Sequence, residues 1–111
     1  MMNYTLPFSV ISPKDCVNNV NVLFDGGIDS FSVAEMDWEG EHVYGIRWNV
    51  ARREWDDADK VNGVKTCLGM PTSRGYSVWF VLPDVFISYI NQIIDDEKKR
   101  LKQCAKKSSQ S

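Results

Sequence analysis

The sequence predicts a small α+β domain, in which an antiparallel sheet of about four strands carries a short N-terminal helix and a long C-terminal helix. Three observations support this fold class. Apolar and polar residues alternate over residues 20–48, with breaks at glycine-containing turns, as in a β-meander. Residues 76–82 are mostly β-branched or aromatic, and residues 78–82 leave no polar face, which favours a central strand covered on both sides. Apolar residues recur at helical spacing over residues 86–94.

Length, composition and charge bound the domain organisation. Of the 111 residues, 43% are hydrophobic and 12% aromatic, which suits one globular core. Residues 1–94 hold seven basic and twelve acidic side chains, a net charge of −5, whereas residues 95–107 hold six basic and three acidic ones. We therefore expect a single domain over 1–94 and a solvated helical extension with a frayed basic tail over 95–111. Duplex-binding proteins carry a basic patch on the fold itself, so nucleic acid is not an expected partner.

The first element is predicted to be the short helix. Ser12 suits its N-cap, Pro13 its first helical position, and Asp15 the positive end of its dipole. Asn18 and Asn19 disfavour a helix interior, so the helix is expected to end at about Asn18.

The meander follows. A first strand is predicted over residues 20–24, and the Asp-Gly-Gly sequence at 25–27 supplies residues that tolerate the positive φ of a hairpin turn. A second strand is therefore expected to return from Phe31. The Glu-Gly-Glu sequence at 39–41 predicts another turn, and the alternation resumes over 42–48 as a third strand.

Residues 50–70 interrupt the strand pattern. This stretch is polar and irregular, which predicts a long loop with at most one or two helical turns over 54–61. Loops of this length are often functional, so a site is expected there first. The acidic cluster in this loop is interpreted as an exposed loop rather than a cation site. It consists of Asp56, Asp57 and Asp59.

The long helix is expected to follow the stop at Pro83, with Asp84 as its cap and a buried stripe over 86–94. Beyond Asp95 the helix is mainly charged, which predicts a solvated rod that frays over 106–111.

No catalytic, metal or cofactor motif is recognised. His42 is the single histidine, and no CxxC pair occurs, so neither a triad nor a zinc site is expected. The odd number of cysteines predicts free thiols and a reducing, cytoplasmic location. These cysteines are Cys16, Cys67 and Cys104. The N-terminus lacks a signal-peptide pattern, and no apolar run is long enough to span a membrane.

Arginines near aromatic residues form the candidate site. Arginine stacks on rings and binds carboxylates or phosphates, so such residues can line a pocket for an anionic or planar ligand. The candidate ligand-binding residues are Arg47, Asn49, Trp55, Ser73 and Arg74. In the alternative interpretation, Arg47 or Arg74 pairs internally with Asp56 or Glu35 and fixes the loop on the sheet.

Four ordered motifs carry a resemblance to known sequences. They are V-L-F-D-G-G at 22–27, G-I-R-W-N at 45–49, L-G-M-P-T-S-R-G-Y at 68–76 and W-F-V-L-P at 79–83. In this order they resemble a family of small bacterial proteins of unassigned function, similar to the products of mobile gene cassettes. The resemblance covers residues 12–94 and implies no activity, substrate or catalytic residue. Residues 50–66 are longer than the family pattern implies.

The function expected first is a non-enzymatic binding or interaction module that forms a homodimer or binds another protein. The alternative is a protein, or a small enzyme, that binds a small anionic ligand between the 50–70 loop and the start of the 76–82 strand. A weaker alternative is nucleic-acid contact through the basic C-terminal tail. No cofactor is expected.

Overall fold

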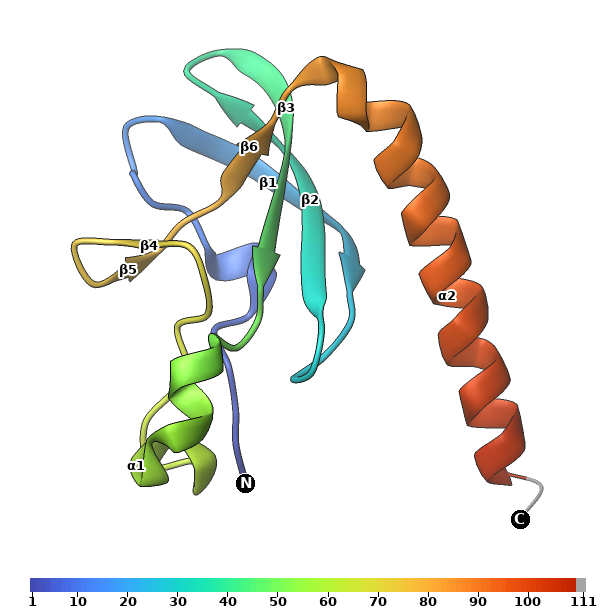
Figure 1. Cartoon of the computed structure of the whole chain (residues 1–111). Coiled ribbons are helices and arrows are strands. Elements are labelled where there is room, and N and C mark those ends of the chain that lie inside the picture. Colours follow the sequence, from blue (N-terminus) through green and yellow to red (C-terminus); the bar gives the residue numbers. More distant parts are fainter. Residues whose placement is uncertain (110–111) are drawn as a thin grey trace.

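The computed structural model describes residues 1–109, with side chains for residues 1–103, and has the expected α+β fold (Figure 1). A four-stranded antiparallel sheet has the strand order β1-β2-β3-β6. The helix α2 (Ile87–Ser109) runs along one side of this sheet. Among the described residues, no helix is both long and apolar enough to cross a membrane.

The predicted meander is confirmed. It consists of β1 (Val17–Asp25), β2 (Phe31–Trp38) and β3 (Glu41–Trp48), joined by hairpins at the two glycine-containing turns. Gly27 in the first turn has a φ of +89°, a conformation that costs glycine little because it has no Cβ.

The helix predicted from Ser12 to Asn18 is wrong. Residues 13–16 form a turn, and β1 begins at Val17. Val17 is buried and pairs with Trp38, so sheet pairing and burial outweigh the local helix-start signal. The short helix near the N-terminus is instead the 3-10 helix η1 (Pro7–Ser9).

The strand predicted over 76–82 is neither continuous nor central. Its first part, β5 (Tyr76–Ser77), pairs with β4 (Thr72–Ser73) in a small separate hairpin. Its last part, β6 (Phe80–Leu82), pairs with β3 at the edge of the main sheet. Between them, Trp79 turns into the core, and its Nε1 donates to the Val10 carbonyl at 2.9 Å. Phe80 stays 58% exposed, so the apolar run marks an open apolar surface rather than burial on both faces.

The segment 50–70 contains two short helical turns within the expected loop. These are the 3-10 helix η2 (Arg52–Asp56) and the helix α1 (Ala58–Val61). The N-terminal segment holds the end of this loop, because the Cys67 amide donates to the Asn3 carbonyl at 3.0 Å and the Thr5 amide donates to the Cys67 carbonyl at 2.9 Å.

The two faces of the sheet bury different clusters. On one face Met36 and Trp79 pack with residues of the N-terminal segment. Gly45 allows this close approach, because a Cβ there would lie 2.9 Å from the Trp79 Cβ. On the other face Val33 packs against Ile90 and Ile94 of α2.

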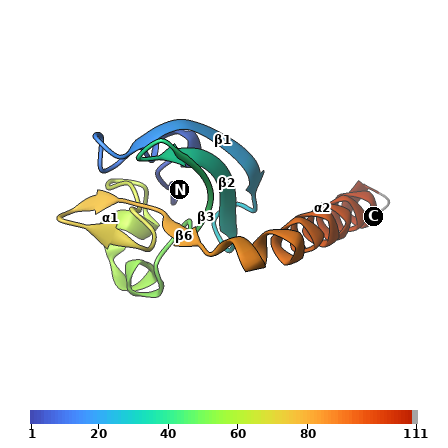
Figure 2. The same cartoon turned by 90° about the horizontal axis from the view of Figure 1, so that it is seen from above.

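The helix α2 covers the sheet incompletely. A 3-10 turn, η3 (Asp84–Phe86), precedes it, and Asp84 is the first residue of that turn rather than a side-chain cap. Of the predicted apolar stripe, Ile90 and Ile94 are buried, whereas other members stay exposed. The exposed members are Phe86, Tyr89 and Ile93. Figure 2 shows α2 standing to one side of the sheet rather than lying flat on it. The backbone is helical to Ser109, and residues 110–111, the last two of the frayed end predicted over 106–111, lie outside the described residues.

We expect Trp79→Phe to lower the free energy of unfolding by about 2 kcal/mol, because it leaves the buried Val10 carbonyl unpaired and a cavity beside it. Urea denaturation measures this change. The matched control Tyr89→Phe, at an exposed helix position, should change it by less than about 0.5 kcal/mol. Equal unfolding midpoints for both variants would show that the Trp79 hydrogen bond does not stabilise the core.

Candidate functional site

An open apolar groove lies between the sheet and α2, with a volume of about 520 Å³. The sheet supplies Phe31, Ile46, Trp48 and Phe80. Ile90 and Ile93 of α2 face them, and Met70 and Pro71 close the end nearest the irregular segment. The groove is open because α2 packs closely on the sheet only at Ile90 and Ile94. These two are the buried residues of α2 among the side chains that the structure describes.

Two smaller hollows adjoin this groove. The Trp55 hollow, of about 350 Å³, shares Trp48 and Met70 with the groove and adds Asp29 and Arg52. The Arg53 hollow, of about 390 Å³, is lined by Arg52 and Arg53 together with Met70 and Pro71. Since Met70 borders all three, we call the groove and the two hollows together the Met70 surface.

Arg47 is buried beside the groove and is bonded to the backbone. Its side chain is 3% exposed and donates hydrogen bonds to the carbonyls of Leu68, Pro71 and Val78. The guanidinium carbon lies 6.0 Å from the centre of the Trp79 ring. Burial lowers the pKa of Arg47 to about 10, although the charge of Glu54 raises it, so the side chain remains charged at neutral pH.

Arg47 therefore holds the irregular segments around Leu68 and Val78 on the sheet through hydrogen bonds to backbone carbonyls, and not through an ion pair with a carboxylate. In the part of the chain that the structure describes, neither Arg47 nor Arg74 forms an ion pair with Asp56 or Glu35, so the internal pairing considered from the sequence is wrong. Glu35 binds His42 at 3.0 Å instead.

Glu54 holds the same segment from the other side. It is 3% exposed, and its carboxylate accepts hydrogen bonds from the backbone amides of Ala51, Leu68 and Gly69 at 2.8, 2.8 and 2.9 Å. Lys60 Nζ donates to it at 2.7 Å. Burial raises the pKa of Glu54, but the hydrogen bonds from Lys60 and the three amides outweigh that effect, so its pKa lies below the ordinary value.

Asn49 belongs to a polar network under the first hairpin. Its Oδ1 accepts from the Ser32 hydroxyl at 2.7 Å, and its Nδ2 donates to the Gly27 carbonyl at 2.8 Å and to Asp25 Oδ1 at 3.1 Å. The Tyr4 hydroxyl donates to the same Asp25 carboxylate at 2.8 Å. Burial, with the hydrogen bond to Asp25 and its negative charge, raises the pKa of Tyr4 to about 12. This network joins the N-terminal segment to the hairpin.

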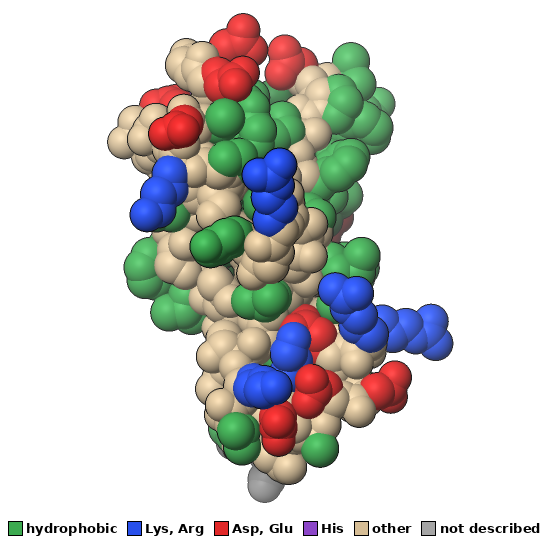
Figure 3. Space-filling view, turned by 90° about the vertical axis from the view of Figure 1, so that its left-hand side faces the viewer, with side chains coloured by type: hydrophobic (Ala, Val, Ile, Leu, Met, Phe, Trp, Pro, Cys, Tyr) green, Lys and Arg blue, Asp and Glu red, His purple; other side chains and the backbone are tan. Residues whose placement is uncertain are grey.

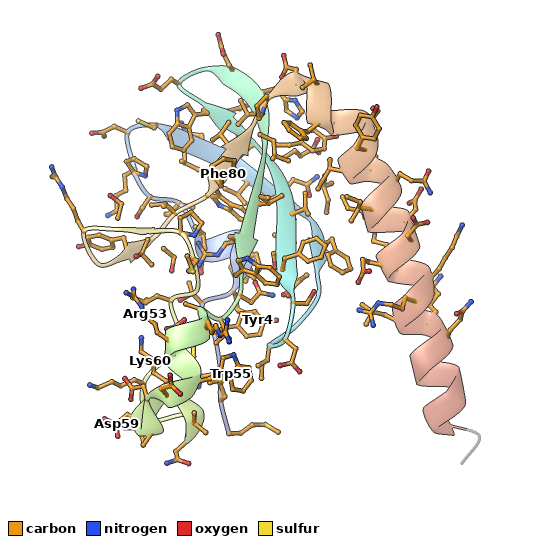
Figure 4. The ribbon with its side chains drawn as sticks, viewed as in Figure 1. Tyr4, Arg53, Trp55, Asp59, Lys60 and Phe80 are labelled. Atoms are coloured by element: carbon orange, nitrogen blue, oxygen red, sulfur yellow. The ribbon has the colours of Figure 1, made fainter. Side chains whose placement is uncertain are left out.

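The structure brings together some of the five candidate site residues. Arg47 and Trp55 border adjoining parts of the Met70 surface. Figure 4 shows Trp55 in the lower segment that contains η2 and α1, well below Phe80 on β6, so the Met70 surface is extended. Asn49 is buried in the polar network. Ser73 and Arg74 line a separate hollow beside the β4–β5 turn.

Sequence reasoning missed Glu54 and most of the groove. The apolar run over 78–82, which contains Phe80, is the available signal for the groove, but the same pattern predicts a central strand. No pattern in the sequence around Met70 predicts that this side chain is 49% exposed. The amide partners of Glu54 are distant in sequence, so no local pattern could predict them.

The remaining acidic side chains and Cys67 have structural surroundings. Among the described residues, no three or more His, Cys, Asp or Glu side chains are grouped to hold a metal ion. Asp57 caps α1 by accepting from the Asp59 amide at 3.0 Å. Figure 3 shows acidic and basic side chains interspersed at this lower end of the molecule. Cys67 is fully buried, and burial raises the pKa of its thiol.

Comparisons with protein-family models, with curated protein sequences and with solved structures find no match to this chain. The resemblance to small bacterial proteins therefore stays an expectation from the four sequence motifs.

We expect Glu54→Gln to lower the free energy of unfolding by about 3 kcal/mol, because it removes a buried charge paired with Lys60 and points an NH2 group at backbone donors. Urea denaturation and the amide NMR signals of Leu68 and Gly69 measure the effect. The control Asp56→Asn, at an exposed carboxylate of the same turn, should stay within about 0.5 kcal/mol of wild type. Equal stabilities of the two variants would contradict the structural role of Glu54.

We expect the Tyr4 ring to titrate at a pH of about 12, and Asp25→Asn to move that pKa towards the ordinary value of 10.0. Because the folded pKa is raised, the unfolded chain releases this proton first, so the stabilisation is present below pH 10.0 and is lost as the pH rises through about 12. NMR titration of the ring follows the pKa directly. A Tyr4 pKa that is the same in wild type and Asp25→Asn would rule out the hydrogen-bonded pair.

Proposed function

We propose that this protein is a non-enzymatic interaction module and that the Met70 surface docks an apolar segment of a partner protein. The observation that carries the proposal is the continuous apolar lining of the groove, which is open to solvent. Among its lining residues, Phe80 is 58% exposed, Trp48 55% and Met70 49%. Exposed apolar surfaces of this kind in soluble proteins are often interaction sites.

The residue types favour a protein partner. Trp, Phe, Met and Arg are enriched at the centres of protein–protein interfaces, and Trp and Arg dominate their binding energy. All four types border the Met70 surface. A small-molecule site encloses most of its ligand, whereas the groove and the two hollows form an open surface that suits a chain segment better.

The groove does not coincide with the pocket expected from the sequence between the 50–70 loop and the start of the 76–82 strand. Met70 and Phe80 line the groove, whereas Ser73 and Arg74, which were expected to line that pocket, border a separate hollow. A second copy of this chain is the rival occupant, in line with the expected homodimer.

A random peptide library displayed on phage tests this proposal. We expect the wild-type protein to enrich peptides with apolar or aromatic residues, and Ile93→Asp to weaken their binding at least about tenfold, because it places a charge in the groove. The matched control Val85→Asp, at an exposed position that does not line the groove, should bind them like wild type.

Two results would overturn the proposal. One is a selection in which wild type and Ile93→Asp enrich the same peptides equally well. The other is light scattering that shows a wild-type dimer and an Ile93→Asp monomer, since the groove would then be an interface between copies of this chain.

A further inference from the structure

Positive charge gathers at the Met70 surface although the domain is acidic. Residues 1–94 contain seven basic and twelve acidic side chains. Three of those basic residues border the groove and its two hollows, whereas Asp29 is the one acidic residue among the described side chains that line them. The three basic residues are Arg47, Arg52 and Arg53. The acidic surplus therefore lies elsewhere on the domain.

The two exposed arginines are available to a partner. Arg52 and Arg53 begin η2, and within the described side chains neither is within ion-pair distance of a carboxylate. Glu54, their neighbour, is buried and engaged by Lys60 and three backbone amides. The carboxylate closest to them in sequence is thus already used inside the fold, and the exposed Asp56 of the same turn lies beyond ion-pair distance of both arginines.

Arg47 adds a positive charge behind the groove. Its guanidinium is bonded to carbonyl oxygens, which are neutral dipoles and leave its net charge in place. Its Nε is buried without a hydrogen-bond partner. The buried Glu54 charge acts on Arg47, but Glu54 is itself paired with Lys60, so the three side chains together keep one net positive charge that favours an anionic partner at the adjoining surface.

We propose that the docked segment is acidic, with apolar anchors in the groove followed by Asp or Glu side chains that reach Arg52 and Arg53 across Met70. The proposal rests on the proposed function, because it needs the groove to hold the apolar part. Arginine suits this role, since its planar fork binds a carboxylate through two parallel hydrogen bonds. Met70 lies where the docked segment would pass from the groove to the two arginines. Its side chain suits this position because it is unbranched and adapts to different partners.

The experiment compares the charge of the peptides that different variants select from one random library. We expect wild type to enrich peptides with apolar residues next to Asp or Glu. The double variant Arg52→Glu/Arg53→Glu should bind those peptides at least about tenfold more weakly and should enrich Lys- or Arg-containing peptides instead. The control Arg74→Glu reverses an exposed arginine in the β4–β5 turn and should keep the wild-type preference.

The outcomes separate this inference from the proposed function. Selected peptides that are apolar but neutral or basic would overturn the acidic partner and leave the apolar docking intact. The acidic partner would also be overturned if Arg74→Glu changed the charge of the selected peptides as much as Arg52→Glu/Arg53→Glu does. The effect would then come from the overall charge of the protein and not from the two arginines. If wild type and Ile93→Asp select alike, the docking surface itself fails.

Discussion

The hydrogen bonds of Arg47 are the constraint on which the rest of the structure depends. Its guanidinium joins the carbonyls of Leu68, Pro71 and Val78, so two irregular stretches of chain are held at the edge of β3. Glu54 acts alongside Arg47, because its carboxylate accepts hydrogen bonds from the amides of Ala51, Leu68 and Gly69, near the two ends of the 50–70 segment. Two buried charged side chains thus bond to backbone amides and carbonyls that no strand or helix pairs. Leaving such groups unpaired inside a protein would cost free energy.

The Met70 surface is a consequence of this arrangement. With the segment fixed, Met70 and Pro71 close one end of a groove whose sides are the sheet and α2. The helix uses Ile90 and Ile94 for packing and leaves Ile93 towards the groove. Because the exposed arginines stand beside Met70, the apolar groove and the positive hollows form one surface. Such a combination supports recognition of a segment that is apolar in one part and acidic in the next.

The elements that the sequence predicted correctly are those that depend on local periodicity. The alternation of residues and the turn glycines specify the meander, and the helical spacing specifies α2. The helix over residues 12–18 failed because the burial of Val17 in the sheet outweighs its capping signals. The strand over 76–82 failed because an apolar run has the same pattern whether a second layer covers it or a groove leaves it open. Of the candidate site residues, Arg47 and Trp55 border the Met70 surface, whereas Ser73 and Arg74 line a separate hollow. Glu54 was not predicted because its amide partners are distant in the sequence.

The most direct test is an experimental structure of the protein bound to the tightest peptide selected from the library. We predict apolar side chains of the peptide between Phe80 and Ile93, and a carboxylate within hydrogen-bond distance of Arg52 or Arg53. A peptide seated beside the β4–β5 turn, or one whose carboxylates point away from both arginines, would contradict the account.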